Sequence, residues 1–480
     1  MKLKDLLEGV AVLSCGIDTE TEIRGISFDS QTTQAGDLFV AIAGEVVDGR
    51  CYIHEALEKG AVCAVCDRPV EGEIPVVSVE NARKALADIS ANYFGHPAQE
   101  LTVVGVTGTN GKTTTTYLIK HILEKCCGAK VGLIGTVCNM IGKEELPAQR
   151  TTPESYEVQE LLRRMVDDGC SYAVMEVSSH ALAMERVRGI FFTTAAFTNL
   201  TQDHLDFHGT MERYCDAKAQ LFEQCGTAVY NRDDPWYPRM LRHSRCCQLS
   251  FGIHSEAEVR ASNVHMAADH VAFCLHAGAQ TLPVQVAIPG VFTVYNALTA
   301  LAVCSVLGVS LQEGAAALRD DHGAKGRMEV VPTPGKPYTV LIDYAHTPDA
   351  LENVLRTVRG FAKGRTVALF GCGGDRDRGK RPQMGEIAGR LADFTVVTTD
   401  NPRTESPEAI IADIVGGIPK GALYCTIVDR AEAICWALAH GQADDVIVLC
   451  GKGHEDYVEI NHEKYPQDER KIVAQYMKNE

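Results

Sequence analysis

The stretch VVGVTGTNGKTTTTYLIK, from Val103 to Lys120, constrains the fold of this chain more than any other. An apolar run predicts a buried strand, a glycine- and threonine-rich turn follows it, and the next residues are typical of a helix. Gly108 and Gly111 let the backbone approach a phosphate, and the amides that open a helix attract anions. Lys112 can neutralise β- and γ-phosphate charge, and Thr113 can bind Mg²⁺. The stretch therefore predicts a nucleoside-triphosphate site in a parallel α/β sheet.

This loop departs from the standard phosphate-binding motif, because Val106 stands where the motif has its first glycine. A simple Gly-Thr turn would explain neither the Gly-Lys-Thr order nor the strand in front, so we favour a nucleotide loop that is shorter than the standard one. The loop residues expected to bind ATP are Gly108, Thr109, Asn110, Gly111, Lys112, Thr113 and Thr114.

Bulk composition limits the class of protein. A chain of 480 residues suggests about three domains. The hydrophobic content of 45% and the charged content of 23% are those of a globular protein, and the net charge of -17 disfavours a nucleic-acid binder. The opening MKLKDLLEGVAVLSCG lacks a long apolar core, so we expect neither a signal peptide nor membrane insertion. We expect a cytoplasmic monomer.

Eighteen cysteines are scattered among aliphatic positions, which fits a reducing compartment rather than a disulfide framework. Cys63 and Cys66 have metal or redox spacing, but they lie in GAVCAVCDRPV, a pattern typical of a buried strand. We therefore interpret the pair as core packing.

The alternation of strands and helices predicts three α/β domains. The first covers residues 1–98, the second residues 99–328 and the third residues 329–480. In the third, TVLIDYAH, TVALFGCGG, FTVVTTD and DVIVLCGKG are apolar strands with polar or glycine-rich ends. Ligands of such sheets bind at the carboxyl ends of the strands, so these polar ends are candidate site residues.

A second group of candidate metal-binding side chains, carboxylates and histidines, follows two strands of the middle domain. YAVMEVSSHAL carries Glu176 at the end of a strand, and NLTQDHLDFHG places Asp203, His204, Asp206 and His208 within six residues. Carboxylates near a phosphate loop suit Mg²⁺, so the group predicts a metal or phosphate site. A solvated strand end and helix capping are the alternatives.

TGTNGKTT and these two segments, with YCDAKAQLF, together resemble the Mur ligases and the related folylpolyglutamate synthetases. The resemblance implies a uridine-nucleotide-binding domain, a central ATPase-type parallel sheet and a Rossmann-like C-terminal domain. It implies Mg²⁺ held by Thr113, Glu176, His204 and a carbamylated Lys218, with Lys112, His204 and Lys218 as catalytic residues. From the residues alone Lys218 is a lysine on a helix surface, so its role rests wholly on the resemblance.

The resemblance extends to further substrate contacts. It implies that Asn296 contacts adenine, although YNALTALAVCSVLG would equally let Asn296 cap a helix that begins there. Arg327, Asp343 and His346 would contact ATP as the domains close. The uridine-nucleotide substrate would be bound by Ser30, Thr151, Thr152, Ser178 and Arg186. Met184 stands where the family usually has glutamine, which puts one substrate hydrogen bond in doubt.

The C-terminal motifs GCGGDRDRGKR, DNPRTE and GKGHEDY resemble the branch of the family that adds meso-diaminopimelate. Arg403 in DNPR can bind the far carboxylate of that amino acid bidentately, whereas a lysine substrate would bring an ammonium group there. The residues implied as amino-acid contacts are Arg376, Asp400, Asn401, Pro402, Arg403, Gly451 and Glu455.

The implied reaction is ATP-dependent addition of diaminopimelate to UDP-MurNAc-L-Ala-D-Glu through an acyl phosphate, in cytoplasmic peptidoglycan precursor synthesis. Its alternatives are the same reaction with L-lysine and, from another class, a nucleotide-gated ATPase or binding protein without ligase activity. A dinucleotide-dependent oxidoreductase ranks low, because GCGGDRDRG breaks the third glycine position of its fingerprint.

Overall fold

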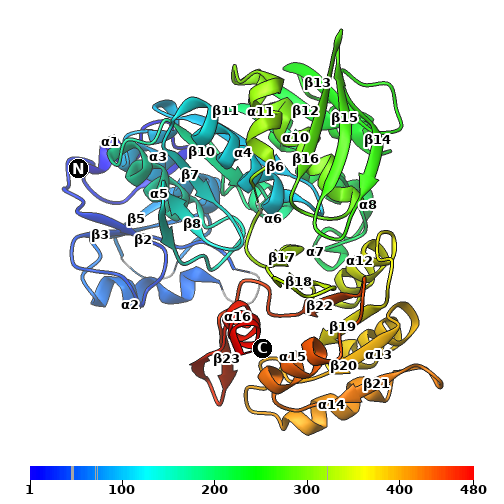
Figure 1. The fold of residues 1–480 in the computed structure, drawn as a ribbon. Helices are drawn as coiled ribbons and strands as arrows, with labels where there is room; N and C mark the ends of the chain where they lie inside the picture. Colours follow the sequence, from blue (N-terminus) through cyan, green and yellow to red (C-terminus); the bar gives the residue numbers. More distant parts are fainter. Residues whose placement is uncertain (45–47, 71, 73, 322, 480) are drawn as a thin grey trace. The chain divides into compact units, whose positions relative to one another are not determined.

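The computed structural model describes residues 1–44, 48–70, 72, 74–321 and 323–479 (Figure 1). It divides into two compact units. The first comprises Met1–Phe251 with Ala302–Val309, and the second comprises Gly252–Leu301 with Ser310–Glu480. The three domain ranges expected from the sequence stay predictions.

The N-terminal sheet of the first unit has the strand order β1-β5-β4-β3-β2. Its strands β2 to β5 pair in parallel, and β1 is antiparallel to β5. Both cysteines of the Cys63–Cys66 strand are buried, as predicted. The elements are β1 (Val12–Cys15), β2 (Gly25–Ser27), β3 (Asp37–Val40), β4 (Cys63–Cys66), β5 (Val76–Val79), α1 (Leu3–Leu6), α2 (Ile53–Glu58), α3 (Ala82–Tyr93) and the 3₁₀ turns η1 (Gly49–Tyr52) and η2 (Pro97–Gln99).

The second sheet of the first unit is built around β6 (Thr102–Thr107), which lies between β10 (Tyr172–Glu176) and β11 (Phe192–Phe197). All three strands are parallel, so their carboxyl ends meet at one edge and bring the phosphate loop beside Glu176. The sheet continues through β12 (Cys225–Asn231) and β13 (Cys247–Gly252) on one side. On the other side it continues through β7 (Val131–Ile134), β8 (Asn139–Ile141) and β9 (Glu144–Leu146).

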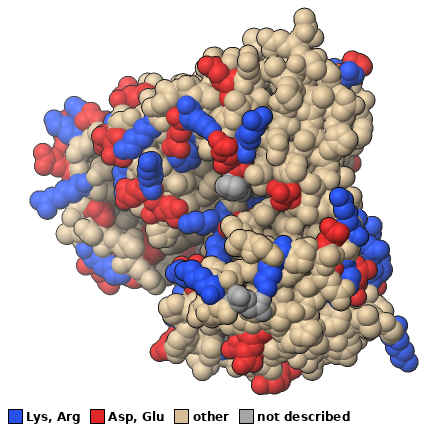
Figure 2. All heavy atoms as spheres, viewed as in Figure 1, with Lys and Arg blue, Asp and Glu red and all other residues tan. Residues whose placement is uncertain are grey.

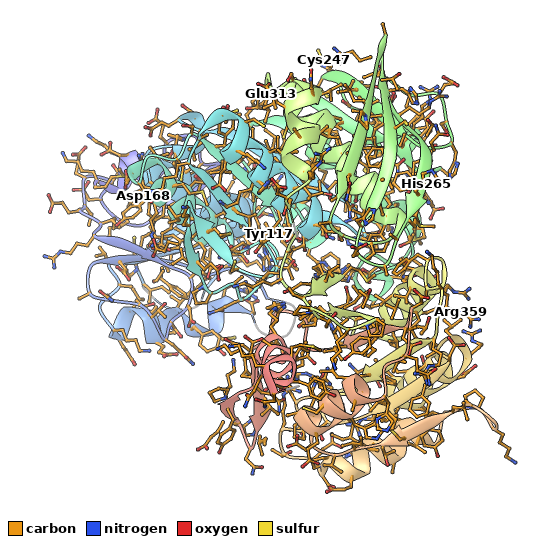
Figure 3. All side chains as sticks on the ribbon, in the orientation of Figure 1. Tyr117, Asp168, Cys247, His265, Glu313 and Arg359 are labelled. Carbon is orange, nitrogen blue, oxygen red and sulfur yellow. The ribbon has the colours of Figure 1, made fainter. Side chains whose placement is uncertain are left out.

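Helices begin where the sequence supplies caps. The helix α5 (Ser155–Asp167) begins after Glu154, whose backbone amide donates to the Glu157 carboxylate at 2.8 Å in a capping box. Tyr117, labelled in Figure 3, lies on α4 (Lys112–Cys127). Its hydroxyl is 3.3 Å from Cys138 Sγ. The remaining helices of this unit are α6 (Ser179–Ala183), α7 (Leu205–His208), α8 (Met211–Ala219), η3 (Gln220–Glu223) and α9 (Tyr237–Met240).

The second unit opens with an antiparallel segment that the sequence interpretation missed. We expected a parallel sheet through residues 99–328, but β14 (Val259–Met266), β15 (Val271–Ala277) and β16 (Gln280–Val286) pair antiparallel. Gly278, with φ +57°, makes the tight turn between β15 and β16. Alternating burial along β15 is typical of such a half-exposed strand. The helices α10 (Val291–Val306) and α11 (Leu311–Leu318) follow.

The C-terminal sheet has the order β17-β18-β22-β19-β20-β21, and only the pairing of β17 with β18 is antiparallel. The apolar strands predicted in the third domain are confirmed as β18 (Thr339–Asp343), β19 (Thr366–Phe370), β20 (Phe394–Val397) and β22 (Val446–Cys450). The other elements are β17 (Glu329–Val331), β21 (Tyr424–Thr426), the hairpin of β23 (Tyr457–Ile460) and β24 (Glu463–Pro466), α12 (Pro348–Arg359), α13 (Lys380–Leu391), α14 (Pro407–Val415), α15 (Arg430–Ala439) and α16 (Glu469–Asn479). The predicted α/β fold class is confirmed.

Surface charge is mixed in sign on the one face of the molecule that Figure 2 draws. On the face drawn in Figure 2, basic and acidic side chains lie interspersed over the N- and C-terminal parts of the chain. This differs from the single broad basic face of a typical nucleic-acid binder. Among the described helices, none combines the length and apolar character that crossing a membrane requires.

Candidate active site

The phosphate loop joins β6 to α4 and depends on two glycines. Gly108 has φ +146°, and a Cβ atom there would lie 2.0 Å from Thr198 Oγ1. Gly111, with φ +85°, occupies the N-cap of α4 in a left-handed conformation. Lys112 Nζ donates to the carbonyl oxygens of Gly108 and Thr109, at 2.9 and 2.8 Å. The lysine thus folds back over the loop from the start of the helix.

Asn199, which the sequence interpretation missed, holds the loop from the end of β11. Its carbonyl oxygen accepts from Thr109 N at 2.8 Å, and its side-chain oxygen accepts from Asn110 N at 3.0 Å. Its side-chain nitrogen also donates to Asn110 O at 3.0 Å. A polar residue just after a buried strand, in FTNL, was the signal that could have identified it.

Glu176 is the buried carboxylate beside the loop. It is 1% exposed and accepts from Thr113 Oγ1 at 3.0 Å and from Thr136 N at 2.8 Å. Thr136 Oγ1 also donates to it at 3.0 Å. Hydroxyl and carboxylate oxygens are the ligands that Mg²⁺ prefers, so Thr113 and Glu176 fit this ion. The described residues contain no group of three or more His, Cys, Asp or Glu side chains with metal-binding geometry.

Lys218 corrects the interpretation of a surface lysine. It lies on α8 with only 1% of its surface exposed, and its Nζ donates to Gly108 O at 2.8 Å. Its Nζ also lies 4.7 Å from the centre of the Tyr214 ring. Burial, with a contribution from the charge of Lys112, holds the pKa of Lys218 well below its usual value. A buried lysine of this kind favours its neutral, nucleophilic amine.

His204 lies among aromatic rings near Lys218. Its ring is half-exposed and stands edge-on to His180, with the ring centres 4.7 Å apart, and 6.2 Å from the centre of the Tyr214 ring. The Glu176 carboxylate accepts its hydrogen bonds from Thr113 and Thr136, not from His204. The structure therefore pairs Thr113 with Glu176 and leaves the metal-binding role of His204 a prediction.

The predicted substrate threonines are connected to the same carboxylate. Thr136 Oγ1 lies 3.1 Å from Thr151 Oγ1. Thr152 Oγ1 donates to the backbone oxygen of Glu176 at 2.8 Å and accepts from Ser178 N at 3.1 Å. The predicted nucleotide residues and substrate residues thus share one hydrogen-bonded network in the first unit.

Arg186 extends this region toward a buried glutamate that the sequence interpretation missed. Its Nε lies 3.3 Å from Glu154 Oε2, and its Nη1 donates to Thr152 O at 3.2 Å. Its Nη2 lies 3.5 Å from Met184 Sδ, so the methionine in place of the family's glutamine contacts this arginine. Arg83 also reaches Glu154, at 3.3 Å.

Ser30 stands apart from these residues in the N-terminal sheet region. It is buried, and its hydroxyl donates to Glu55 Oε2 at 3.0 Å, while Lys59 Nζ donates to its carbonyl oxygen at 2.8 Å. Its expected contact with the uridine nucleotide stays a prediction.

The other predicted ATP residues belong to the second unit. Asn296 is buried inside α10, five residues after the helix begins at Val291, which excludes the helix-capping alternative. Asp343 accepts from Met328 N at 2.8 Å and from Ala345 N at 2.9 Å, and burial raises its pKa. These two polar residues are therefore held by the fold itself.

Arg327 and His346 flank one tyrosine. The Arg327 guanidinium lies 5.3 Å from the centre of the Tyr344 ring, and the His346 ring centre lies 4.6 Å from it. Arg327 Nε is buried without a hydrogen-bond partner among the described residues. A buried donor of this kind can be satisfied by a ligand oxygen.

His454, in GKGHE, packs on the same tyrosine and gives a pH prediction. Burial and the charges of Arg327, Arg470 and His346 lower its pKa to about 4, although Asp456 opposes this shift. The unfolded state therefore binds the proton below pH 6.5 while the folded state does not, so stability falls as the pH drops from 6.5 toward 4.

When the pH is lowered from 7 to 5, we expect the free energy of unfolding of the wild-type protein to fall by roughly 2 kcal/mol more than that of His454→Gln. Urea unfolding of both proteins at the two pH values measures this. Equal losses in the two proteins would contradict the shift.

The C-terminal motif DNPR is held by several charged side chains. Asn401 Nδ2 donates to Glu455 Oε2 at 2.9 Å, and its Oδ1 accepts from Lys452 Nζ. A Cβ atom at position 451 would lie only 2.5 Å from Asp400 Oδ2, so Gly451 cannot be replaced by a larger residue without displacing Asp400. Lys452 is fully buried, and the sequence interpretation gave it no role.

Arg403 lies at the centre of the predicted amino-acid site with φ +51°. Its Nη1 donates to Gly374 O at 2.9 Å, and its Nε lies 2.9 Å from Glu459 Oε2. A Cβ atom at Gly373 would lie 3.0 Å from Arg403 Nη1 and 3.8 Å from Arg376 Cγ, so both arginines flank this glycine. The exposed side chain of Arg376 and the partly buried one of Arg403 are thus brought together.

Known protein-family models match the N-terminal, middle and C-terminal regions of the chain. The Mur ligase family catalytic domain matches residues 22–94, the Mur ligase middle domain matches residues 106–304, and the Mur ligase glutamate ligase domain matches residues 326–453.

Individual relatives match over nearly the whole length. The UDP-N-acetylmuramoyl-L-alanyl-D-glutamate–2,6-diaminopimelate ligase of Caldanaerobacter subterraneus subsp. tengcongensis is 46% identical over 99% of each chain. A solved structure of a ligase with the same name is 30% identical, covers 100% of this chain and 99% of its own, and has a TM-score of 0.75. A Thermotoga maritima ligase solved with ADP, at 19% identity, covers 96% of this chain and 99% of its own with a TM-score of 0.62, and so shows the shared fold.

Proposed function

The chain belongs to the Mur ligase family, and we infer from this that it is an ATP-dependent amide-bond ligase of peptidoglycan precursor synthesis. We propose that it joins meso-2,6-diaminopimelate to UDP-MurNAc-L-Ala-D-Glu. The observation that carries the proposal is the 46% identity to a ligase of that name over 99% of the chain. This likeness includes the regions of the phosphate loop, the substrate threonines and DNPR.

We propose that ATP binds the loop from Gly108 to Thr114. Backbone amides at the start of α4 would face the phosphates, and Lys112 Nζ would leave its loop carbonyls to neutralise phosphate charge. Thr113 and Glu176 would hold Mg²⁺, which supplies positive charge next to the transferring phosphoryl group. His204 and carbamylated Lys218 are proposed as further ligands, and Asn296, Arg327, Asp343 and His346 as further ATP contacts.

The buried position of Lys218 supports its carbamylation. A neutral amine can attack carbon dioxide and lose a proton, which leaves an anionic carbamate on the side chain. The lowered pKa of Lys218, caused mainly by burial, favours that neutral amine. An unmodified ammonium group would repel a nearby Mg²⁺, whereas the carbamate would attract it.

The proposed reaction has two steps. The γ-carboxylate of the substrate's D-glutamate attacks the γ-phosphorus of ATP, which gives an acyl phosphate and releases ADP. The amine of diaminopimelate then attacks the carbonyl carbon, and phosphate leaves as the amide forms. The phosphoryl acceptor belongs to the substrate, so the chain needs no nucleophile of its own. Lys112 stabilises the charge on the transferring phosphoryl group.

We propose that the UDP-linked dipeptide contacts Ser30, Thr151, Thr152, Ser178 and Arg186. The amino acid would contact Arg376, Asp400, Asn401, Pro402, Arg403, Gly451 and Glu455. Within this set Arg403 would bind the far carboxylate of diaminopimelate, and Glu455 would bind an ammonium group. Localisation in the cytoplasm and a monomeric state stay predictions.

The decisive assay supplies UDP-MurNAc-L-Ala-D-Glu, ATP and Mg²⁺ with either diaminopimelate or L-lysine and measures phosphate release and the peptide product. We expect product only with diaminopimelate. Lysine incorporation at equal efficiency would overturn the specificity. ATP hydrolysis that does not depend on the UDP-linked substrate would favour the nucleotide-gated ATPase instead.

Arg403→Ala is expected to raise KM for diaminopimelate by roughly 100-fold, because a charged bidentate contact is lost. The same steady-state assay should show a nearly unchanged KM for ATP. A matched control is Arg359→Ala, an arginine on α12 that is distant in sequence from DNPR. Equal losses for both substrates would show that Arg403 has another role.

A further inference from the structure

The hairpin of β23 and β24 is attached to the DNPR loop through one residue in particular, Glu459. Its backbone oxygen accepts from Arg403 N at 3.0 Å, and its backbone amide donates to Asn401 Oδ1 at 2.9 Å. Arg403 O in turn accepts from Asn461 N at 2.9 Å, which completes an isolated parallel bridge between Arg403 and Ile460. Main-chain bonds therefore fix the distance between Glu459 and Arg403 before their side chains meet.

The side chains then form an ion pair inside this frame. Glu459 Oε2 lies 2.9 Å from Arg403 Nε, and the two side chains are 19% and 17% exposed. Partial burial and a fixed backbone separate this pair from freely solvated surface pairs, which contribute little. The left-handed backbone of Arg403 is costly for a residue with a side chain, so the surrounding contacts must maintain it.

The two contacts of the Arg403 guanidinium leave its Nη2 side available to a ligand. Nε forms the ion pair with Glu459 and Nη1 donates the one side-chain hydrogen bond of this guanidinium, to Gly374 O, while Nη2 makes no hydrogen bond with any residue that the structure describes. A guanidinium held at two of its nitrogens is fixed in its plane. The remaining N–H groups on Nη1 and Nη2 form the fork that suits a carboxylate.

We propose that Glu459 is a positioning residue that orients Arg403 and thereby makes the site selective for an amino acid with a second, distal carboxylate. This inference rests on the proposed function and deepens it. Glu459 acts through Arg403, because its carboxylate contacts the Nε edge and leaves the Nη edge for the substrate. In the wild-type protein the Arg403 side chain is already ordered when the chain folds. Without Glu459 it would be mobile in the free enzyme, and its conformational entropy would be lost when the substrate binds, which weakens binding.

The test uses steady-state kinetics of the full chain with diaminopimelate, L-lysine and ATP as varied substrates. Glu459→Ala removes the contact, and Glu459→Gln keeps the side-chain volume but removes the charge. Glu463→Gln is the matched control, because Glu463 lies exposed on the same hairpin and contacts Tyr465. Arg403→Ala and the double variant Arg403→Ala/Glu459→Ala complete a double-mutant cycle.

We expect Glu459→Ala to raise KM for diaminopimelate roughly 10- to 100-fold, and Glu459→Gln to raise it less, with KM for ATP unchanged. The preference for diaminopimelate over lysine should fall by a similar factor. In the Arg403→Ala background, removal of Glu459 should have no further effect on KM. Glu463→Gln should behave as wild type.

An unchanged KM for diaminopimelate in Glu459→Ala would overturn the inference. An equal further loss in the Arg403→Ala background would also overturn it, since Glu459 would then act independently of Arg403. Parallel changes in KM for ATP and in the melting temperature of Glu459→Gln would indicate a purely structural role. If the wild-type protein incorporates no diaminopimelate, the proposed function itself fails.

Discussion

Replacing Lys218 with methionine is expected to reduce ligation by about 10²- to 10³-fold, because the substitution removes a group proposed to carry negative charge beside the phosphate loop. Methionine is apolar and of similar length, so it suits a site in which the lysine is 1% exposed. We therefore expect the folded state to persist. Rates of amide formation with all three substrates measure the loss, and circular dichroism checks the fold.

Lys120→Met is the matched control for Lys218→Met. Lys120 is also a buried lysine, 6% exposed, and it pairs with Glu124 on α4 rather than with the phosphate loop. Carbamylation can be followed directly with ¹³C-labelled bicarbonate and ¹³C NMR. The wild type should give a carbamate signal that Lys218→Met lacks. Full activity in Lys218→Met, or a signal that survives the substitution, would contradict the role of Lys218.

Gly108→Ala is expected to weaken ATP binding by about 100-fold or more and to lower the free energy of unfolding by about 2 kcal/mol or more. The new Cβ would lie 2.0 Å from Thr198 Oγ1 and 3.0 Å from Asn199 O. The φ of +146° is also strained for any residue with a side chain. The loop must therefore move away from the strand end that holds it.

Gly128→Ala, at the other end of α4, separates backbone strain from crowding. Gly128 has φ +60°, and a Cβ there would meet nothing within 4 Å. We expect it to cost about 1 kcal/mol of stability and to leave ATP binding unchanged. Calorimetric titration with ATP and thermal unfolding compare the two variants. ATP affinity in Gly108→Ala equal to that of wild type would show that the loop tolerates the displacement.

Local patterns predicted the parts of the site that follow directly from strand ends. Thr113 and Glu176 come from separate motifs, 63 positions apart in the chain, and the structure brings them within hydrogen-bond distance. This was predictable because β6 and β10 are parallel neighbours with apolar cores and polar ends. The same rule predicted the polar ends of β18, β20 and β22.

Contacts made across elements were not predictable in this way. The burial of Lys218 depends on how α8 packs, and a nine-residue helix with a mixed pattern does not show which face is inside. Glu459 lies in a hairpin 56 positions after Arg403, on a strand of intermediate burial, and neither segment carries a pattern that identifies the other. The antiparallel strands β14 to β16 were missed because they mix polar and apolar residues and lack the continuous apolar runs that identified the parallel strands.

The hydrogen bonds of Glu176 have a kinetic consequence. One of its oxygens accepts from Thr113 at the phosphate loop and from Thr136, and the Thr136 hydroxyl also lies 3.1 Å from Thr151. If Thr113 binds the metal of a nucleotide as proposed, it would release the Glu176 oxygen that it shares with Thr136. The hydrogen bonding of Thr136, and through it that of Thr151, would then change. Occupancy of one substrate site should therefore alter the dissociation rate from the other, and the two affinities should be thermodynamically linked.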